Sequence, residues 1–150
     1  MADELHLRAE DVEDLAVLSS CLQDALVPLA DMRYEPAERR FLIAVNRFRW
    51  EADTGGRVAR SFERIACGVA FEDVRGVRFR GIDPKKRDRL LELLAIVAHD
   101  EGADGTAIEL MFAGSGTIRL EVERIRIRLD DFGEPWPTRW LPRHREAGEP

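Results

Sequence analysis

The sequence predicts an α+β domain: an N-terminal helix, then a bent antiparallel sheet or small barrel of about seven strands, then a short C-terminal helix. Three observations lead to this prediction. Apolar residues alternate with polar or small ones in several runs, as they do along a strand that buries one face. Glycine-containing turns separate these runs, which is typical of antiparallel strands. A stretch with helical spacing of apolar residues precedes them.

The N-terminal helix is expected over residues 9–25. Apolar residues recur there at intervals of three and four, at Val12, Leu15, Leu18 and Leu22. Acidic residues crowd the first turns, where the helix dipole favours negative charge. Pro28 ends the pattern.

A hairpin is expected next, with strands over 29–35 and 41–50. Pro36 occupies the second position of the turn between them, where its fixed φ angle fits. The apolar residues of the return strand change parity between Val45 and Phe48. One extra residue in a strand moves the later side chains to the other face, so a bulge is predicted near Asn46.

The middle of the chain predicts the core strands. Two of them span about 63–71 and 75–82, and hairpin loops are expected at 102–105 and 114–116. Residues 90–99 fit a helix or a strand, and we expect a short helical turn that leads into a strand. The predicted core consists of the inward residues of these strands and two helix residues: Leu15, Leu22, Ile65, Val69, Phe71, Val77, Phe79, Ile108, Leu110, Phe112, Ile118, Leu120 and Val122.

Residues 121–132 have two interpretations. Val122, Ile125 and Leu129 have helical spacing, and Gly133 is a typical stop signal. Residues 124–129, however, alternate strictly, and β-branched residues favour strands. Of these two interpretations, we expect the helix. The chain is expected to form a single domain over 1–150, in which 134–150 is an irregular tail that contains proline and tryptophan.

Composition narrows the possible partners and the compartment. The net charge of −6 argues against general affinity for nucleic acid or for an anionic membrane, because both require a basic surface. No secretory signal or membrane-length apolar run is visible. Cys21 and Cys67 stand apart, in no C-x-x-C pair. We therefore expect a cytoplasmic protein with two reduced thiols.

The sequence offers little for catalysis. His99 is followed by Asp100 and Glu101, but adjacent residues of a strand point to opposite faces, so they make a poor metal site. Ser115 lies in G-S-G and not in the G-x-S-x-G of a nucleophile elbow. No catalytic residue, cofactor or metal is predicted, and the protein is expected to be a binding module rather than an enzyme.

Arginines on the polar faces of the strands are the first candidate for contact with a partner. Arg47 and Arg49 lie on one predicted strand, Arg78 and Arg80 on another, and Arg124 and Arg128 would join them if residues 121–132 are a strand. Neighbouring guanidinium groups would bind an anion or an acidic peptide. Pairing of these arginines with glutamates across the strands is the more ordinary interpretation.

The tail is the second candidate. Pro135 and Pro137 flank Trp136 and favour an extended backbone. Trp136 and Trp140, with Arg139 between them, would be costly to leave in water. We expect them to fold back onto the domain or to contact an unknown protein partner, including a second copy of this chain.

Five motifs together resemble a family of uncharacterised bacterial single-domain proteins, a domain of unknown function. They are L-x-A-E-D near the start, C-L-Q-D-A at 21–25, N-R-F-R-W-E at 46–51, F-A-G-S-G-T-I-R-L-E-V-E at 112–123 and the tail segment at 133–142. The resemblance implies a stand-alone domain and no activity. The order of strands and a closing helix is also similar to that of pleckstrin-homology-like domains.

The function predicted from the sequence is a non-catalytic cytoplasmic binding or protein-interaction module. One alternative is a small enzyme with a site assembled from loops around His99 and the strand arginines. Another is a structural homodimer.

Overall fold

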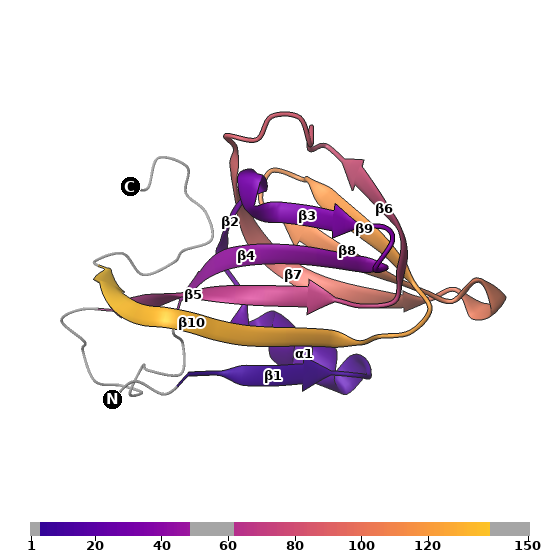
Figure 1. The fold of residues 1–150 in the computed structure, drawn as a ribbon, viewed down its shortest axis with the longest axis horizontal. Coiled ribbons are helices and arrows are strands. Elements are labelled where there is room, and N and C mark those ends of the chain that lie inside the picture. The colour runs from indigo at the N-terminus through magenta and orange to yellow at the C-terminus, as the bar shows by residue number, and fades with distance from the viewer. Residues whose placement is uncertain (1–3, 49–61, 139–150) are drawn as a thin grey trace.

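The computed structural model describes residues 4–48 and 62–138, which form a bent antiparallel sheet of ten strands with one α-helix (Figure 1). Their bounds along the chain are β1 (His6–Ala9), α1 (Val12–Cys21), β2 (Leu26–Pro28), the 3-10 turn η1 (Leu29–Asp31), β3 (Met32–Glu35), β4 (Arg40–Phe48), β5 (Phe62–Phe71), β6 (Val74–Arg80), β7 (Leu90–Asp100), the 3-10 turn η3 (Gly102–Asp104), β8 (Thr106–Phe112), β9 (Thr117–Val122) and β10 (Ile127–Thr138).

The strands follow the order β1-β10-β5-β4-β2-β7-β8-β9-β6, and β3 also pairs with β4. The sheet bends so that β1, β10, β5, β4 and β3 make a front layer and β7, β8, β9 and β6 lie behind it (Figure 1). The short strand β2 joins the two layers by pairing with β4 and with β7. Helix α1 packs against β7 and β1.

The core lies between the two layers. On β4, for example, Phe41, Ile43 and Val45 point inward and are at most 2% exposed, while the alternate residues face outward. The core prediction is confirmed, except that Val77 and Phe79 on the outermost strand β6 are only half-buried.

The predicted fold class is wrong. A strand, β1, precedes the helix, and the described residues contain ten strands rather than about seven. Four residues of β1 were too few to show a period, and β2 has only three. Asp11 caps α1 by accepting a hydrogen bond from the Asp14 amide, and the helix is therefore shorter than predicted at its start.

The predicted C-terminal helix is also wrong, and with it the pleckstrin-homology-like order. The segment after Leu120 completes β9, turns, and forms β10, which pairs with β5 and β1. Ile127 and Leu129 are buried at alternate positions, so the strict alternation of 124–129 was the correct signal. Strand β10 continues to Thr138, into the segment for which an irregular tail was expected.

Two local predictions fail for identifiable reasons. Residues 90–99 are entirely strand, because their backbone pairs first with β2 and then with β8. No bulge occurs near Asn46: β4 and β5 pair in unbroken register from Phe41 to Phe48. The apolar residues only appear to change parity. Arg47 occupies the next core-facing position after Val45, and Phe48 is buried on the opposite, outer face of the strand beside Arg64.

Within the described ranges, no helix combines the length and the apolar character that crossing a membrane requires.

Candidate functional site

The outer face of the front layer carries side chains in three rows that cross β4, β5 and β10. Residues paired in an antiparallel ladder project to the same face, so the register defines the rows. The first row is Arg33, Leu42, Ala70 and Arg128; the second is Ala44, Gly68 and Asp130; the third is Asn46, Ala66 and Phe132.

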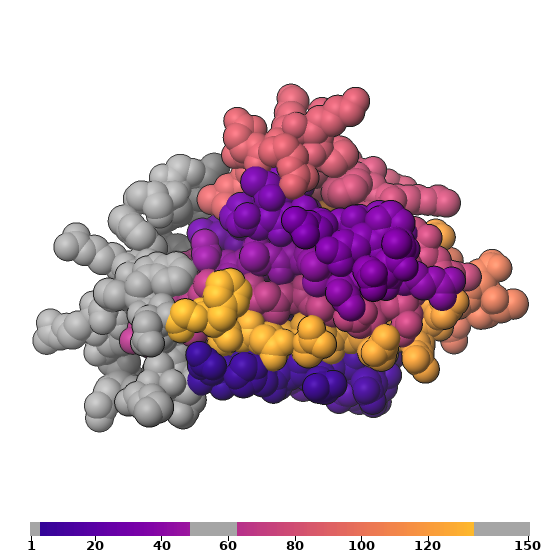
Figure 2. All heavy atoms as spheres, viewed as in Figure 1, coloured from indigo at the N-terminus to yellow at the C-terminus, as the bar shows by residue number. Residues whose placement is uncertain are grey.

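A groove of about 540 Å³ lies on this face, and we call it the outer groove. Its floor is formed by Leu42, Ala44, Gly68 and Ala70. The face is turned toward the viewer in Figure 2, where β5 in magenta lies between β3 and β4 in purple and β10 in orange. The walls therefore come from β3 on one side and from β10 on the other.

The floor follows from the sequence of β5. Ile65, Cys67 and Val69 face the core, so the intervening residues face outward, and all of these that line the groove are small. Packing does not require a glycine at position 68. A Cβ atom there would lie 3.9 Å from the Phe132 ring and 4.0 Å from the Asp130 carbonyl oxygen, which are ordinary contacts. A glycine without a steric reason often marks the close approach of another group.

The β3 wall is cationic. Arg87, from the loop after β6, donates hydrogen bonds from Nη2 to the carbonyl oxygens of Ala30 and Met32, both at 3.1 Å. Arg33 is largely exposed, and among the described residues its side chain makes one long contact, at 3.5 Å with Glu35. Asp31 lines the same wall. Among the residues that line this wall, two guanidinium groups therefore stand against one carboxylate, and Glu35, which contacts Arg33, does not line the groove.

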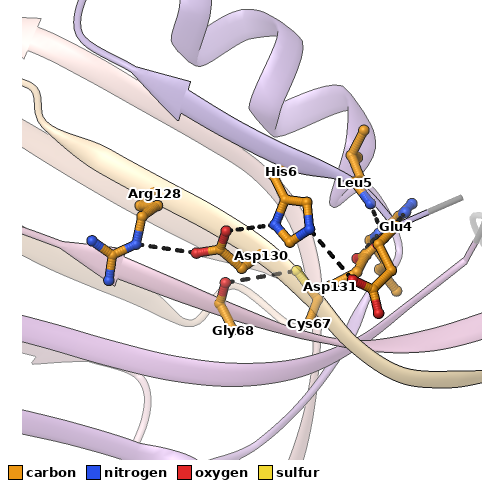
Figure 3. A network of polar contacts seen from close by, with 9 residues as sticks. Glu4, Leu5, His6, Cys67, Gly68, Arg128, Asp130 and Asp131 are labelled. Carbon is orange, nitrogen blue, oxygen red and sulfur yellow. Dashed lines mark hydrogen bonds and ion pairs between the residues drawn. The ribbon is translucent and has the colours of Figure 1, made fainter.

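The β10 wall carries a network of charged groups (Figure 3). Asp130 accepts a hydrogen bond from Arg128 Nε at 3.1 Å, and its Oδ1 lies 2.8 Å from His6 Nδ1. His6 also lies 3.4 Å from Glu4. The hydrogen bond with His6, followed by that from Arg128, lowers the pKa of Asp130 despite partial desolvation. Asp130 is therefore ionised, and its negative charge is already balanced by Arg128 and His6.

The pKa of His6 is raised, first by its hydrogen bond with Asp130. The stabilisation from this pair is fully present below the pKa of an unfolded histidine, about 6.5, and is lost as pH rises through the higher folded value. We expect an NMR titration of the imidazole to show a pKa above that of a free histidine, and Asp130→Asn to move it down. Asp88→Asn, in an exposed loop, serves as the control and should leave it unchanged. An unchanged His6 pKa in Asp130→Asn would contradict this assignment.

Behind the groove, the core face of the same strands holds a buried ion pair. Arg47 donates from Nε and Nη2 to the two carboxylate oxygens of Asp131, at 2.8 and 2.7 Å, and both side chains are fully buried. Asp131 also accepts a hydrogen bond from the Leu5 amide. Burial raises the pKa of Asp131, but the bonds from Arg47 and Leu5 outweigh it and leave a lowered value.

Cys67 lies beside this pair, opposite Asp131 in the register of β5 and β10. Burial is the main reason that the pKa of its thiol is strongly raised. The thiol is therefore protonated and unreactive at neutral pH. We assign this cluster to the stability of the fold and not to chemistry.

The candidate residues from the sequence do not converge. Arg47 is buried, whereas Arg78 and Arg80 are exposed on β6 in the back layer, where Arg78 lies 3.9 Å from Glu121. Trp136 belongs to β10 and is opposite Arg64 in the register, but its side chain lies outside the described residues. So do Arg49, Arg139 and Trp140. Of the additional arginines, Arg124 binds Asp73 and Arg128 lines the outer groove.

His99 belongs to a partly exposed chain of polar contacts on the back layer. Its Nε2 lies 3.1 Å from Glu109, which also contacts Arg119, and Arg119 binds Glu101 at 2.8 Å. Arg119 and Glu101 line a second cavity of about 310 Å³, but His99 does not. Within the described residues, no three His, Cys, Asp or Glu side chains are arranged to hold a metal ion.

A comparison with protein families matches residues 5–144 to one family, described as "Protein of unknown function (DUF2948)". Comparisons with curated proteins and with solved structures found no match.

Proposed function

This chain belongs to the DUF2948 family, whose function is unknown, and we propose that it is a non-catalytic binding domain that takes its ligand in the outer groove. The observation that carries the proposal is the groove itself. Its volume of about 540 Å³ falls within the range of small-molecule sites, roughly 300–1,000 Å³. A few polar groups surround an apolar floor, which is the usual composition of such sites.

Phe132 supports the choice of this face. Its side chain is 51% exposed although it borders an apolar floor, and its Cε1 atom would lie 3.9 Å from a Cβ atom at position 68. Exposed aromatic rings beside a concave apolar surface are typical of binding sites.

Binding rather than catalysis is favoured by what lines the groove. Among the described residues, the lining contains no histidine, cysteine, serine or lysine, and its two carboxylates are Asp31 and Asp130. Asp130 is already hydrogen-bonded to Arg128 and His6, which leaves Asp31 without a second acid or base beside it in the groove. His99, the candidate base of the alternative enzyme, lies on the back layer. We propose a cytoplasmic location, supported by two cysteines that form no disulfide.

The proposal is tested by filling the groove. Gly68→Val places a β-branched side chain on the floor, where a Cβ atom meets only ordinary contacts. A library of small-molecule fragments is screened by NMR spectra of the labelled protein. We expect fragments that bind the wild-type chain to change the chemical shifts of the backbone amides of the groove floor. In Gly68→Val these changes should disappear while the melting temperature shifts by only a few degrees.

Gly76→Val is the matched control, because Gly76 also lies on a strand and a Cβ atom there meets nothing within 4 Å. This variant should bind fragments like the wild type. Hits that cluster away from the groove, or that persist in Gly68→Val, would overturn the proposal. A wild-type chain that elutes as a dimer and a Gly68→Val variant that elutes as a monomer would instead favour the structural homodimer.

A further inference from the structure

We infer that the outer groove takes a small oxyanion, a carboxylate or a phosphate carried on a flat apolar body. Its anionic group would bind at Arg33 and Arg87, and its apolar body would lie on the floor beside Phe132. The inference rests on the proposed function and adds the chemical class of the ligand.

The charges of the groove favour an anion. Its lining contains three guanidinium groups, from Arg33, Arg87 and Arg128, and two carboxylates, from Asp31 and Asp130. Asp130 is already compensated by Arg128 and His6. Among the lining residues, the remaining positive charge therefore lies on the β3 wall, and Glu35, outside the lining, offsets only part of the charge of Arg33 through its 3.5 Å contact. The net charge of the protein as a whole is −6. A local cationic site on an acidic surface is selective for small anions over large polyanions.

Arg87 is already positioned to receive the anion. Its Nη2 atom is held by two carbonyl oxygens, those of Ala30 and Met32. Among the described residues, no partner is found for its Nε and Nη1 atoms, so donors remain on a guanidinium whose position is fixed. A group that is fixed before binding loses less entropy when the ligand arrives. Guanidinium groups bind carboxylates and phosphates with two parallel hydrogen bonds.

The rest of the groove requires an apolar body. Ala44, Gly68 and Ala70 offer no hydrogen-bonding side chain, and the small size of these residues lets a flat group approach the sheet closely. The ring of Phe132 provides an aromatic edge or face at the opposite wall.

The width of the groove excludes an inorganic anion as the whole ligand. Strands β3 and β10 are separated by β4 and β5, which makes three strand spacings, or about 14 Å between their backbones. Free phosphate would contact one wall only. Phe132 is also two rows further along the strands than Arg33, so the two side chains approach the floor from opposite corners. A body of two fused rings with one anionic substituent covers the floor between the long side chains of the arginines and the ring of Phe132.

Three probes with the same apolar body test the inference: naphthoate, naphthyl phosphate and the neutral naphthalenemethanol. We expect the full wild-type chain, in calorimetric or NMR titrations at low salt, to bind at least one anion about tenfold more tightly than the alcohol. Naphthoate and naphthyl phosphate distinguish a carboxylate from a phosphate ligand. Added salt should weaken binding of the anions and not of the alcohol.

Substitutions separate the two parts of the site. Arg33→Gln combined with Arg87→Gln should remove the preference for anions and leave binding of the alcohol unchanged. Arg78→Gln, an exposed arginine on β6, is the control and should change neither. Gly68→Val should weaken all three probes.

Two results would overturn the inference. Equal binding of all three probes in the groove would exclude the oxyanion and leave the proposed binding function intact. Absence of naphthoate and naphthyl phosphate binding, with fragments still found in the groove by the unbiased screen, would likewise reject this ligand class alone. Only fragments that bind elsewhere would remove both proposals.

Discussion

Replacing Asp131 with alanine is expected to lower the free energy of unfolding by about 3–5 kcal/mol. Asp131 and Arg47 form a two-bond ion pair in which both side chains have no exposure to solvent. Removal of the carboxylate leaves a guanidinium in the core, where a charge without its counterion is strongly disfavoured. Denaturant unfolding followed by circular dichroism measures the change.

A double variant separates the net contribution of the ion pair to stability from the penalty of leaving one of its charges buried alone. Arg47→Met combined with Asp131→Leu should be more stable than Asp131→Ala alone, because no uncompensated charge is buried. Asp88→Ala, in an exposed loop, should change stability by less than about 0.5 kcal/mol. A loss of less than about 1 kcal/mol in Asp131→Ala would contradict a tightly buried pair.

Replacing Phe71 with alanine is expected to cost about 3–5 kcal/mol, because transfer and cavity contributions add. Phe71 has no exposed surface, and its ring lies 6.1 Å from that of Phe41 at an angle of 49°. Phe132 provides a matched comparison, since it is half exposed on the groove.

Phe132→Ala should cost far less in the same denaturation experiment, about 1 kcal/mol or below, while weakening binding in the groove. Similar costs for the two substitutions would mean that Phe132 is a core residue. The outer groove would then have no exposed aromatic side chain in its wall, and the proposed binding site would lose that support.

The inward face of each long strand could be read from the sequence, but the number of strands could not. Alternation predicted the buried residues of β5, β8 and β9 correctly, because each of these strands is long enough to show its period. Strands β1 and β2 are held by pairing with β10, β4 and β7, which are distant in sequence. Residues 121–132 were misjudged because Val122, Ile125 and Leu129 happen to fit a helical interval as well.

The site was less predictable than the fold. A signal for the floor was present in the sequence, since Ala66, Gly68 and Ala70 occupy the outward positions of β5 where polar residues are usual. No short stretch of the sequence indicated the residues that form the walls of the groove. Arg33, Arg87 and Arg128 come from three separate segments, and the pairing of β3 with β4 and of β5 with β10 brings two of them to opposite sides of one floor. The sequence predicts Arg47 as a surface contact because an arginine is rarely buried, whereas the structure buries it completely.

The central claim is that the outer groove is the ligand site, and intermolecular NOEs between naphthoate and the isotope-labelled chain test it most directly. We predict NOEs from the ring protons of naphthoate to the Phe132 ring, to the Gly68 α protons and to the Ala44 methyl group. NOEs confined to residues of the second cavity, such as Thr106 and Ala107, or to the exposed apolar residues of α1, would contradict the account.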